Sequence, residues 1–256
     1  IEDGYRTIAT SSGMSSISIS LLSFLSKDDH CLISDCTYYP TKKFASKILK
    51  KFGVKIDFYN PSDLDALKKK INKKTKLIFM ESPASLTFEV EDVSEIIKIA
   101  KKKKIITMLD NSWATPFYFS PINIGIDISI LAATKYISGH ADTMLGLITV
   151  KNEKLFLKIK DTAVNLGDSP GPQECYLSLR GLRTLSTRLE QHRSNALKIA
   201  RLLESNDKVS KVFHPALPKN ENYSLWNKYF TGSTGLFSFI LKEQSKNKVF
   251  KMIDKL

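Results

Sequence analysis

The chain has 256 residues, of which 42% are hydrophobic, 10% aromatic and 25% charged, enough for one large globular domain or one and a half smaller ones. Its 39 Lys and Arg residues outnumber 26 Asp and Glu residues, for a net charge of +13. The lysines are spread over many predicted helices without interleaved aromatic residues, which argues against a nucleic-acid-binding protein.

The three cysteines lack metal-ligand or CxxC spacing, and no signal peptide or long apolar run is present, which argues against a disulfide framework, a cysteine metal site and a membrane span. We therefore expect a cytoplasmic protein with no metal, no nucleic-acid partner and no membrane association. Residue 1 is not Met, and predicted elements are cut at both ends, so we expect the sequence to be the middle of a longer protein.

Short apolar runs predict strands at 30–34, 54–59, 76–81, 105–110, 127–133 and 145–150. Amphipathic segments between them predict helices at 14–26, 40–52, 62–71 and 92–103, the third with Ser62 as N-cap and Asp65 as an acidic residue of the first turn. This alternation is typical of an α/β fold with a mainly parallel sheet, which places its ligand at the carboxyl ends of the strands.

The alternation stops after Val150. Residues 151–166 read as a helix, 167–173 as a loop and 174–206 as a long helix interrupted around "LRGLRTL", and a new strand at 235–241 precedes a further helix. We therefore predict a large domain over residues 1–206 and the start of a second domain over residues 207–256.

Two charged residues end neighbouring predicted strands. Asp110 closes "IITMLD", and Lys135 follows "ISILAAT" 25 residues later. Both side chains are expected at the carboxyl edge of the sheet, where a structural salt bridge and a catalytic pair are equally consistent with the spacing alone.

Other residues predicted at the same edge favour catalysis. In "SSGMSS" (11–16) the backbone N–H groups of Gly13 and Met14 begin a helix and could bind an anion, to which Thr134 could donate its hydroxyl. Tyr38 could stack on a planar ligand. A phosphate cradle, an aromatic ring, a carboxylate and a partly desolvated lysine are what a pyridoxal phosphate site requires.

Seven motifs match one family. The chain resembles the Cys/Met-metabolism pyridoxal phosphate enzymes of fold type I, over all of its residues but only the middle of such an enzyme. The motifs are "SSGM" (11–14), "TYYP" (37–40), "FMESPAS" (79–85), "LDNSWATP" (109–116), "AATKYISGHAD" (132–142), "LSLRGLRTL" (177–185) and "FTGSTGLFSF" (230–239).

The resemblance implies a seven-stranded, mainly parallel sheet in the large domain and an α+β carboxyl-terminal domain. It implies that Lys135 binds pyridoxal 5'-phosphate covalently, that Asp110 pairs with the pyridine nitrogen, and that Tyr38 stacks on the ring and assists the chemistry. Gly13, Met14 and Thr134 would hold the phosphate. Trp113 could either line the cofactor pocket or only pack beneath the sheet.

Within the family the chain is most similar to the β-lyases that cleave cystathionine. The γ-acting relatives have Asn at the position of Ser85 and Ser at the position of Ala132. The resemblance therefore implies α,β-elimination of L-cystathionine, or of another cysteine S-conjugate, to a thiol, pyruvate and ammonia, by a homo-oligomer that is a dimer of dimers. A γ-acting relative and a non-catalytic basic binding protein on the same fold remain the alternatives.

Overall fold

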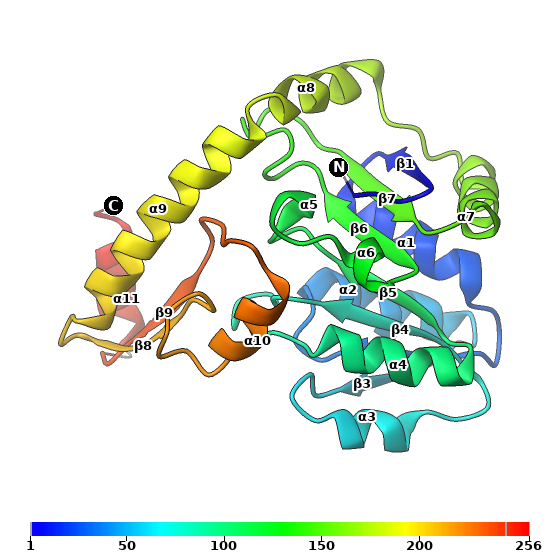
Figure 1. The fold of residues 1–256 in the computed structure, drawn as a ribbon, viewed down its shortest axis with the longest axis horizontal. Helices are drawn as coiled ribbons and strands as arrows, with labels where there is room; N and C mark the ends of the chain where they lie inside the picture. Colours follow the sequence, from blue (N-terminus) through cyan, green and yellow to red (C-terminus); the bar gives the residue numbers. More distant parts are fainter. Residues whose placement is uncertain (1, 244, 256) are drawn as a thin grey trace.

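The computed structural model describes residues 2–243 and 245–255, so Ile1 and Leu256, the outermost residues of the two predicted domains, lie outside the described part. A seven-stranded sheet forms the centre, with the strand order β1-β7-β6-β5-β4-β2-β3 (Figure 1). Its strands are β1 (Arg6–Thr10), β2 (His30–Ser34), β3 (Lys55–Tyr59), β4 (Thr75–Glu81), β5 (Ile106–Asp110), β6 (Ile128–Ala132) and β7 (Gly146–Val150).

Most neighbouring strands run parallel. β3, β2, β4, β5 and β6 form a parallel block, and β7 is antiparallel to both β6 and β1. The predicted α/β fold with a mainly parallel seven-stranded sheet is therefore confirmed, and six strands lie within one residue of their predicted ends. The run before "SSGM" was not predicted as a strand, because β1 is a partly exposed edge strand with Arg and Thr in "RTIAT".

Helices cover both faces of the sheet. One face carries α1 (Gly13–Phe24), α2 (Tyr39–Phe44), the π-helical segment η1 (Ala45–Leu49) and α7 (Glu153–Asn165). The other carries α3 (Leu64–Lys70), α4 (Val93–Lys103), α5 (Thr115–Tyr118) and α6 (Pro121–Ile124) (Figure 1). The sheet is therefore enclosed on both sides.

This enclosure explains the apolar runs. All five residues of β2 are buried, and its side chains alternate between the faces, with Leu32 in one core cluster and Cys31 and Ile33 in the other. One cap prediction is wrong: Asp63, and not Ser62, caps α3, because its Oδ1 accepts the backbone N–H of Ala66 at 2.8 Å.

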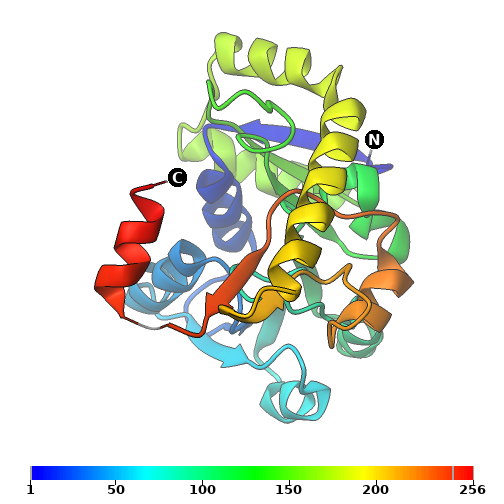
Figure 2. The same ribbon diagram turned by 90° about the vertical axis from the view of Figure 1, so that its left-hand side faces the viewer.

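The rest of the chain forms a smaller lobe beside the sheet. Its long helix breaks between α8 (Pro172–Leu182) and α9 (Leu185–Glu204), and α9 descends from α8 to the two-stranded antiparallel sheet of β8 (Val209–Phe213) and β9 (Ser238–Leu241) (Figure 2). The remaining helices are α10 (Tyr223–Tyr229) and α11 (Lys246–Ile253). A domain boundary at residue 206 stays a prediction. Within residues 2–243 and 245–255, no helix has the length and apolarity needed to span a membrane.

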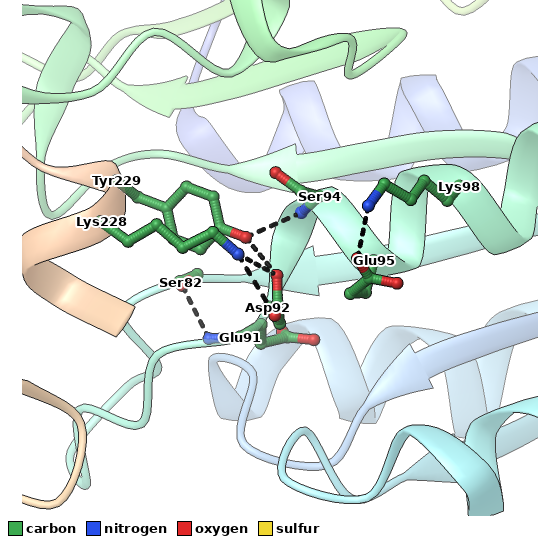
Figure 3. A network of polar contacts seen from close by, with 8 residues as sticks. All are labelled: Ser82, Glu91, Asp92, Ser94, Glu95, Lys98, Lys228 and Tyr229. Carbon is green, nitrogen blue, oxygen red and sulfur yellow. Dashed lines mark hydrogen bonds and ion pairs between the residues drawn. The ribbon is translucent and has the colours of Figure 1, made fainter. Parts of the chain in front are cut away.

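A polar cluster fastens α10 to the start of α4 (Figure 3). The carboxylate of Asp92 accepts the Tyr229 hydroxyl and lies 3.1 Å from the Lys228 ammonium, and the Tyr229 oxygen accepts the backbone N–H of Ser94 at 3.1 Å. Partial burial raises the pKa of Asp92, but the bonds from Tyr229 and Lys228 outweigh it and hold that pKa below its ordinary value. The contact holds the end of α10 beside the large sheet. The segment that follows α10 leads to Leu236, which lines the cavity described below.

Candidate active site

A cavity of about 320 Å³ lies at the carboxyl ends of β4, β5 and β6. Parallel strands expose their terminal residues at one edge, and the polypeptide leaving each strand builds the walls of the cavity. All six residues predicted for the site line it: Gly13, Met14, Tyr38, Asp110, Thr134 and Lys135.

Lys135 lies in the turn that follows β6, and its backbone N–H donates to the carbonyl of Ala132 at 3.1 Å. Its Nζ is 5.7 Å from the centroid of the Tyr38 ring. Lys135 is exposed in the turn beside the cavity, and the partial desolvation of its amine in a cofactor-bound site stays a prediction.

Asp110 is the last residue of β5 and is buried. Its Oδ1 accepts the backbone N–H of Ser112 at 2.9 Å. Burial raises the pKa of Asp110, while hydrogen bonds from Ser112 and the charge of Lys135 oppose that rise. Among the ion pairs of the described residues, none joins Asp110 to Lys135. The simple salt bridge left open by the spacing is therefore not formed.

The amino end of α1 supplies free donors. Ser12 caps the helix, since its Oγ accepts the N–H of Ser15 at 3.1 Å and its carbonyl accepts the N–H of Ser16 at 3.0 Å. No hydrogen bond of the described residues uses the N–H of Gly13 or Met14. These two donors border the cavity and, with the helix dipole, suit an anion.

Gly13 is required for packing at this point. A Cβ at residue 13 would lie 2.8 Å from the Cβ of Ala132, which is too close for two carbon atoms. Glycine thus lets the helix start touch the end of β6, and this contact brings the free N–H groups next to the residues that follow that strand.

The hydroxyl of Thr134 is already engaged. It donates to the carbonyl of Leu145 at 3.2 Å and accepts the N–H of Leu145 at 3.0 Å. These bonds tie the turn after β6 to the residue that precedes β7. To donate to a bound phosphate, the hydroxyl must exchange its bond to the Leu145 carbonyl.

Tyr38 precedes α2 and is 45% exposed. Its backbone N–H donates to Oε2 of Glu81 at 2.7 Å. The carboxyl group of Glu81 thus fixes the loop that presents the ring to the cavity.

Glu81 is the residue that the sequence interpretation missed. It lines the cavity, is buried, and accepts the hydroxyl of Ser85 at Oε1. Burial, with a smaller effect of the neighbouring Asp110 charge, raises the pKa of Glu81 to about 8. The available signal was its place at the end of the predicted strand 76–81, the same place that Asp110 takes in the next strand.

Trp113 lines the cavity, so it does more than pack beneath the sheet. It borders the cavity and also packs edge-on against Phe230, with ring centroids 6.1 Å apart. Its indole N–H donates to the carbonyl of Leu236 at 2.8 Å, while the hydroxyl of Tyr136 accepts the N–H of Gly235 at 3.1 Å. These two bonds hold Leu236 as part of the cavity wall.

The donor set fits pyridoxal 5'-phosphate. Two free N–H groups at a helix start suit the phosphate, a buried carboxylate at the end of β5 suits a protonated ring nitrogen, and an exposed aromatic face lies within reach of a lysine amine. The cavity volume is at the lower end of the range usual for small-molecule sites.

The comparisons with known proteins agree with this fit. The family model described as Cys/Met metabolism PLP-dependent enzyme matches residues 1–256. A putative cystathionine beta-lyase of Rhizobium johnstonii is 40% identical over 100% of this chain and 65% of its own length. An L-alanine/L-glutamate racemase of Wolbachia pipientis is 39% identical over 99% of this chain and 62% of its own length.

A solved structure extends the likeness to the fold. Cystathionine gamma-lyase from Lactobacillus plantarum, complexed with L-serine, superposes with a TM-score of 0.94 at 30% identity, over 97% of this chain and 65% of that one. The chain therefore has the fold of these enzymes. It spans 62–65% of the length of the three proteins named here.

Proposed function

Because the chain belongs to the Cys/Met metabolism PLP-dependent enzyme family, we propose that its cavity binds pyridoxal 5'-phosphate and catalyses a carbon–sulfur β-elimination. The proposed substrate is L-cystathionine or another cysteine S-conjugate. With one water, cystathionine gives homocysteine, pyruvate and ammonia. The observation that carries the proposal is the meeting of Lys135, Asp110, Tyr38 and the start of α1 at one cavity.

Each residue has a role that its position supports. Lys135 holds the cofactor through its amine and, when released, takes the α-proton of the substrate at Nζ and returns a proton to the leaving sulfur. Asp110 keeps the ring nitrogen protonated, since its carboxylate faces the cavity from the end of β5. The bound cofactor supplies an electron sink for the pair left by the α-proton.

The other residues bind and orient. The N–H groups of Gly13 and Met14 receive the phosphate, and Thr134 joins them once its hydroxyl leaves the Leu145 carbonyl. Tyr38 stacks on the ring from the loop that its N–H bond to Glu81 fixes. Lys135 and Tyr38 are the proposed catalytic residues.

The choice of β-elimination rests on two cavity residues, Ser85 and Ala132, which differ from the γ-acting pattern. The second candidate is γ-elimination, because a solved relative is named a cystathionine gamma-lyase. A racemase among the relatives shares the removal of an α-proton. Product analysis separates these reactions. β-Cleavage of cystathionine yields homocysteine and γ-cleavage yields cysteine, whereas racemisation leaves both carbon–sulfur bonds intact.

We also propose a cytoplasmic homo-oligomer, a dimer of dimers. Support comes from α8, where Tyr176 and Leu179 lie one turn apart and are 59% and 57% exposed. Exposed apolar side chains on one helix face are typical of subunit contacts. The molar mass of the protein in solution tests this part.

The central test is chemical. The purified protein is incubated with pyridoxal 5'-phosphate and reduced with borohydride, and the pyridoxyl group is mapped by peptide mass spectrometry. We expect modification of Lys135, and neither modification nor pyruvate release from L-cystathionine in Lys135→Ala. A matched control, Lys102→Ala, changes an exposed lysine of α4 and should behave as the unmodified protein. Modification of another lysine would overturn the assignment, and a protein that takes up no cofactor would be the non-catalytic alternative.

A further inference from the structure

Glu81 joins three parts of the candidate site. Its Oε2 accepts the backbone N–H of Tyr38 at 2.7 Å, and its Oε1 pairs with the hydroxyl of Ser85. Tyr38 follows β2 and Ser85 follows β4, so one carboxyl group ties two loops of the cavity wall together. A side chain in this position controls where the Tyr38 ring lies.

Glu81 also lies beside Asp110. The two residues are partners in the register of the parallel pair β4 and β5, where neighbouring strands are about 4.8 Å apart and paired side chains share a face. Both residues are 8% exposed. Two carboxyl groups so close together and away from water do not both ionise, because each charge penalises the other.

The surroundings decide which group keeps the proton. Asp110 accepts the N–H of Ser112 at 2.9 Å, and Lys135 lies on the same side of the sheet edge. The charge of Lys135 favours ionisation of both acids, as the smallest influence on each, whereas the charge of Asp110 raises the pKa of Glu81. A second buried acid, Glu91, accepts the backbone N–H of Glu81 at 3.2 Å and so fixes the backbone at the end of β4.

The bonds of Glu81 also decide which oxygen carries the proton. Oε2 faces a backbone N–H, which can only donate, so Oε2 must be an acceptor. Oε1 faces the hydroxyl of Ser85, which can donate or accept. A proton on Oε1 reverses the bond that the ionised carboxylate accepts from Ser85, so that Ser85 becomes the acceptor and both contacts are kept.

We propose that Glu81 is a positioning residue of the cofactor site, whose neutral carboxyl group, protonated on Oε1, holds Tyr38 and Ser85 in place and leaves Asp110 as the single negative charge of the pair. The inference rests on the proposed function, because the positions that it explains are those of the cofactor-facing residues. One negative charge at the strand ends then faces one protonated ring nitrogen.

Two variants test the proposal. Glu81→Gln copies the neutral acid, because its amide oxygen accepts the Tyr38 N–H and its NH₂ group donates to Ser85. Glu81→Met has a similar volume and can do neither. Affinity for pyridoxal 5'-phosphate is measured by the quenching of the tryptophan fluorescence of the protein, and the seating of the Tyr38 ring by the visible circular dichroism of the bound cofactor. Thermal unfolding of the cofactor-free variants shows whether each is folded.

We expect Glu81→Gln to keep the affinity within about threefold and to keep the dichroic band, and Glu81→Met to lose about tenfold or more in affinity together with most of the band. If the Gln variant lost as much affinity for pyridoxal 5'-phosphate as the Met variant, the carboxylate charge would be needed, and the proposal would be overturned. If the Met variant does not fold, the Gln variant alone decides, because retained affinity supports the proposal and a tenfold loss overturns it.

The borohydride experiment keeps the two proposals apart. If the unmodified protein takes up no cofactor on Lys135, the proposed function fails and the role of Glu81 fails with it. If Lys135 is modified but the Gln variant binds poorly, only the role of Glu81 is wrong.

Discussion

Glu91 offers a quantitative test of the buried acids beneath the site. Its side chain is fully buried, and its oxygens accept the Tyr59 hydroxyl at 2.6 Å and the backbone N–H of Glu81 at 3.2 Å. These bonds lower the pKa, but burial outweighs them and raises the pKa of Glu91 from 4.5 to about 7. We predict that Glu91→Gln removes a pH dependence of stability that this acid causes.

The sign follows from proton linkage. The folded state binds the proton of Glu91 more tightly than the unfolded state, so the stabilisation is complete below pH 4.5 and is lost as the pH rises through about 7. A difference of about 2.5 pKa units at about 1.36 kcal/mol each gives a loss of about 3 kcal/mol. Glutamine does not titrate, so the variant should not show this loss.

The assay is urea unfolding of the cofactor-free protein at pH 4.5 and pH 8, because a bound cofactor would add its own stabilisation. At pH 4.5 the free energies of unfolding should agree within about 1 kcal/mol, since glutamine resembles the neutral acid. At pH 8 the variant should be more stable by about 2 to 3 kcal/mol. Equal m values in the two proteins would show that the same surface unfolds.

A matched control is Glu204→Gln, which changes an exposed glutamate near the end of α9. It should leave the pH dependence unchanged. If the curves of Glu91→Gln and the unmodified protein run parallel between the two pH values, the pKa of Glu91 is the same in the folded and unfolded states, and the reasoning from burial is refuted.

Four further results are expected. Lys135→Arg should keep the unfolding midpoint and lose the borohydride-stable cofactor, as shown by mass spectrometry. Tyr38→Phe should bind pyridoxal 5'-phosphate within about threefold of the unmodified protein, whereas Tyr38→Ala should lose about tenfold, since stacking needs the ring and not the hydroxyl; equal losses in a fluorescence titration would contradict this. Gly13→Ala should lower the free energy of unfolding by about 1 to 3 kcal/mol in urea, because its methyl group overfills the contact with β6. Tyr229→Phe should lower the free energy of unfolding by about 1 to 2 kcal/mol, because the hydroxyl bonded to Asp92 is lost. Asp92→Ala removes the same contact, so a clearly smaller loss in that variant would show that the contact is not the cause.

The buried strands could be predicted from the sequence because both faces of the sheet are covered. Such strands read as continuous apolar runs, and the chemistry sits just after them, which is how Asp110 and Lys135 were found together. The first turn of α1 was predicted in the same way, from Gly13 and the serines before it.

Other features depend on contacts that no local pattern contains. Glu81 was overlooked because its role comes from strand register and from bonds to Tyr38 and Ser85, which belong to other loops. The hydroxyl of Thr134 donates a hydrogen bond to the carbonyl of Leu145, which lies 11 residues away in the sequence.

The residues that line the cavity are far apart in the chain, from Ser12, which caps α1, to Leu236 before β9. During synthesis on the ribosome the amino-terminal segments emerge first, so a nascent chain carries Lys135 and Asp110 long before it carries Leu236. The wall of the site is thus completed only after Leu236 has emerged. Cofactor capture by a growing chain would accordingly report how far its folding has advanced.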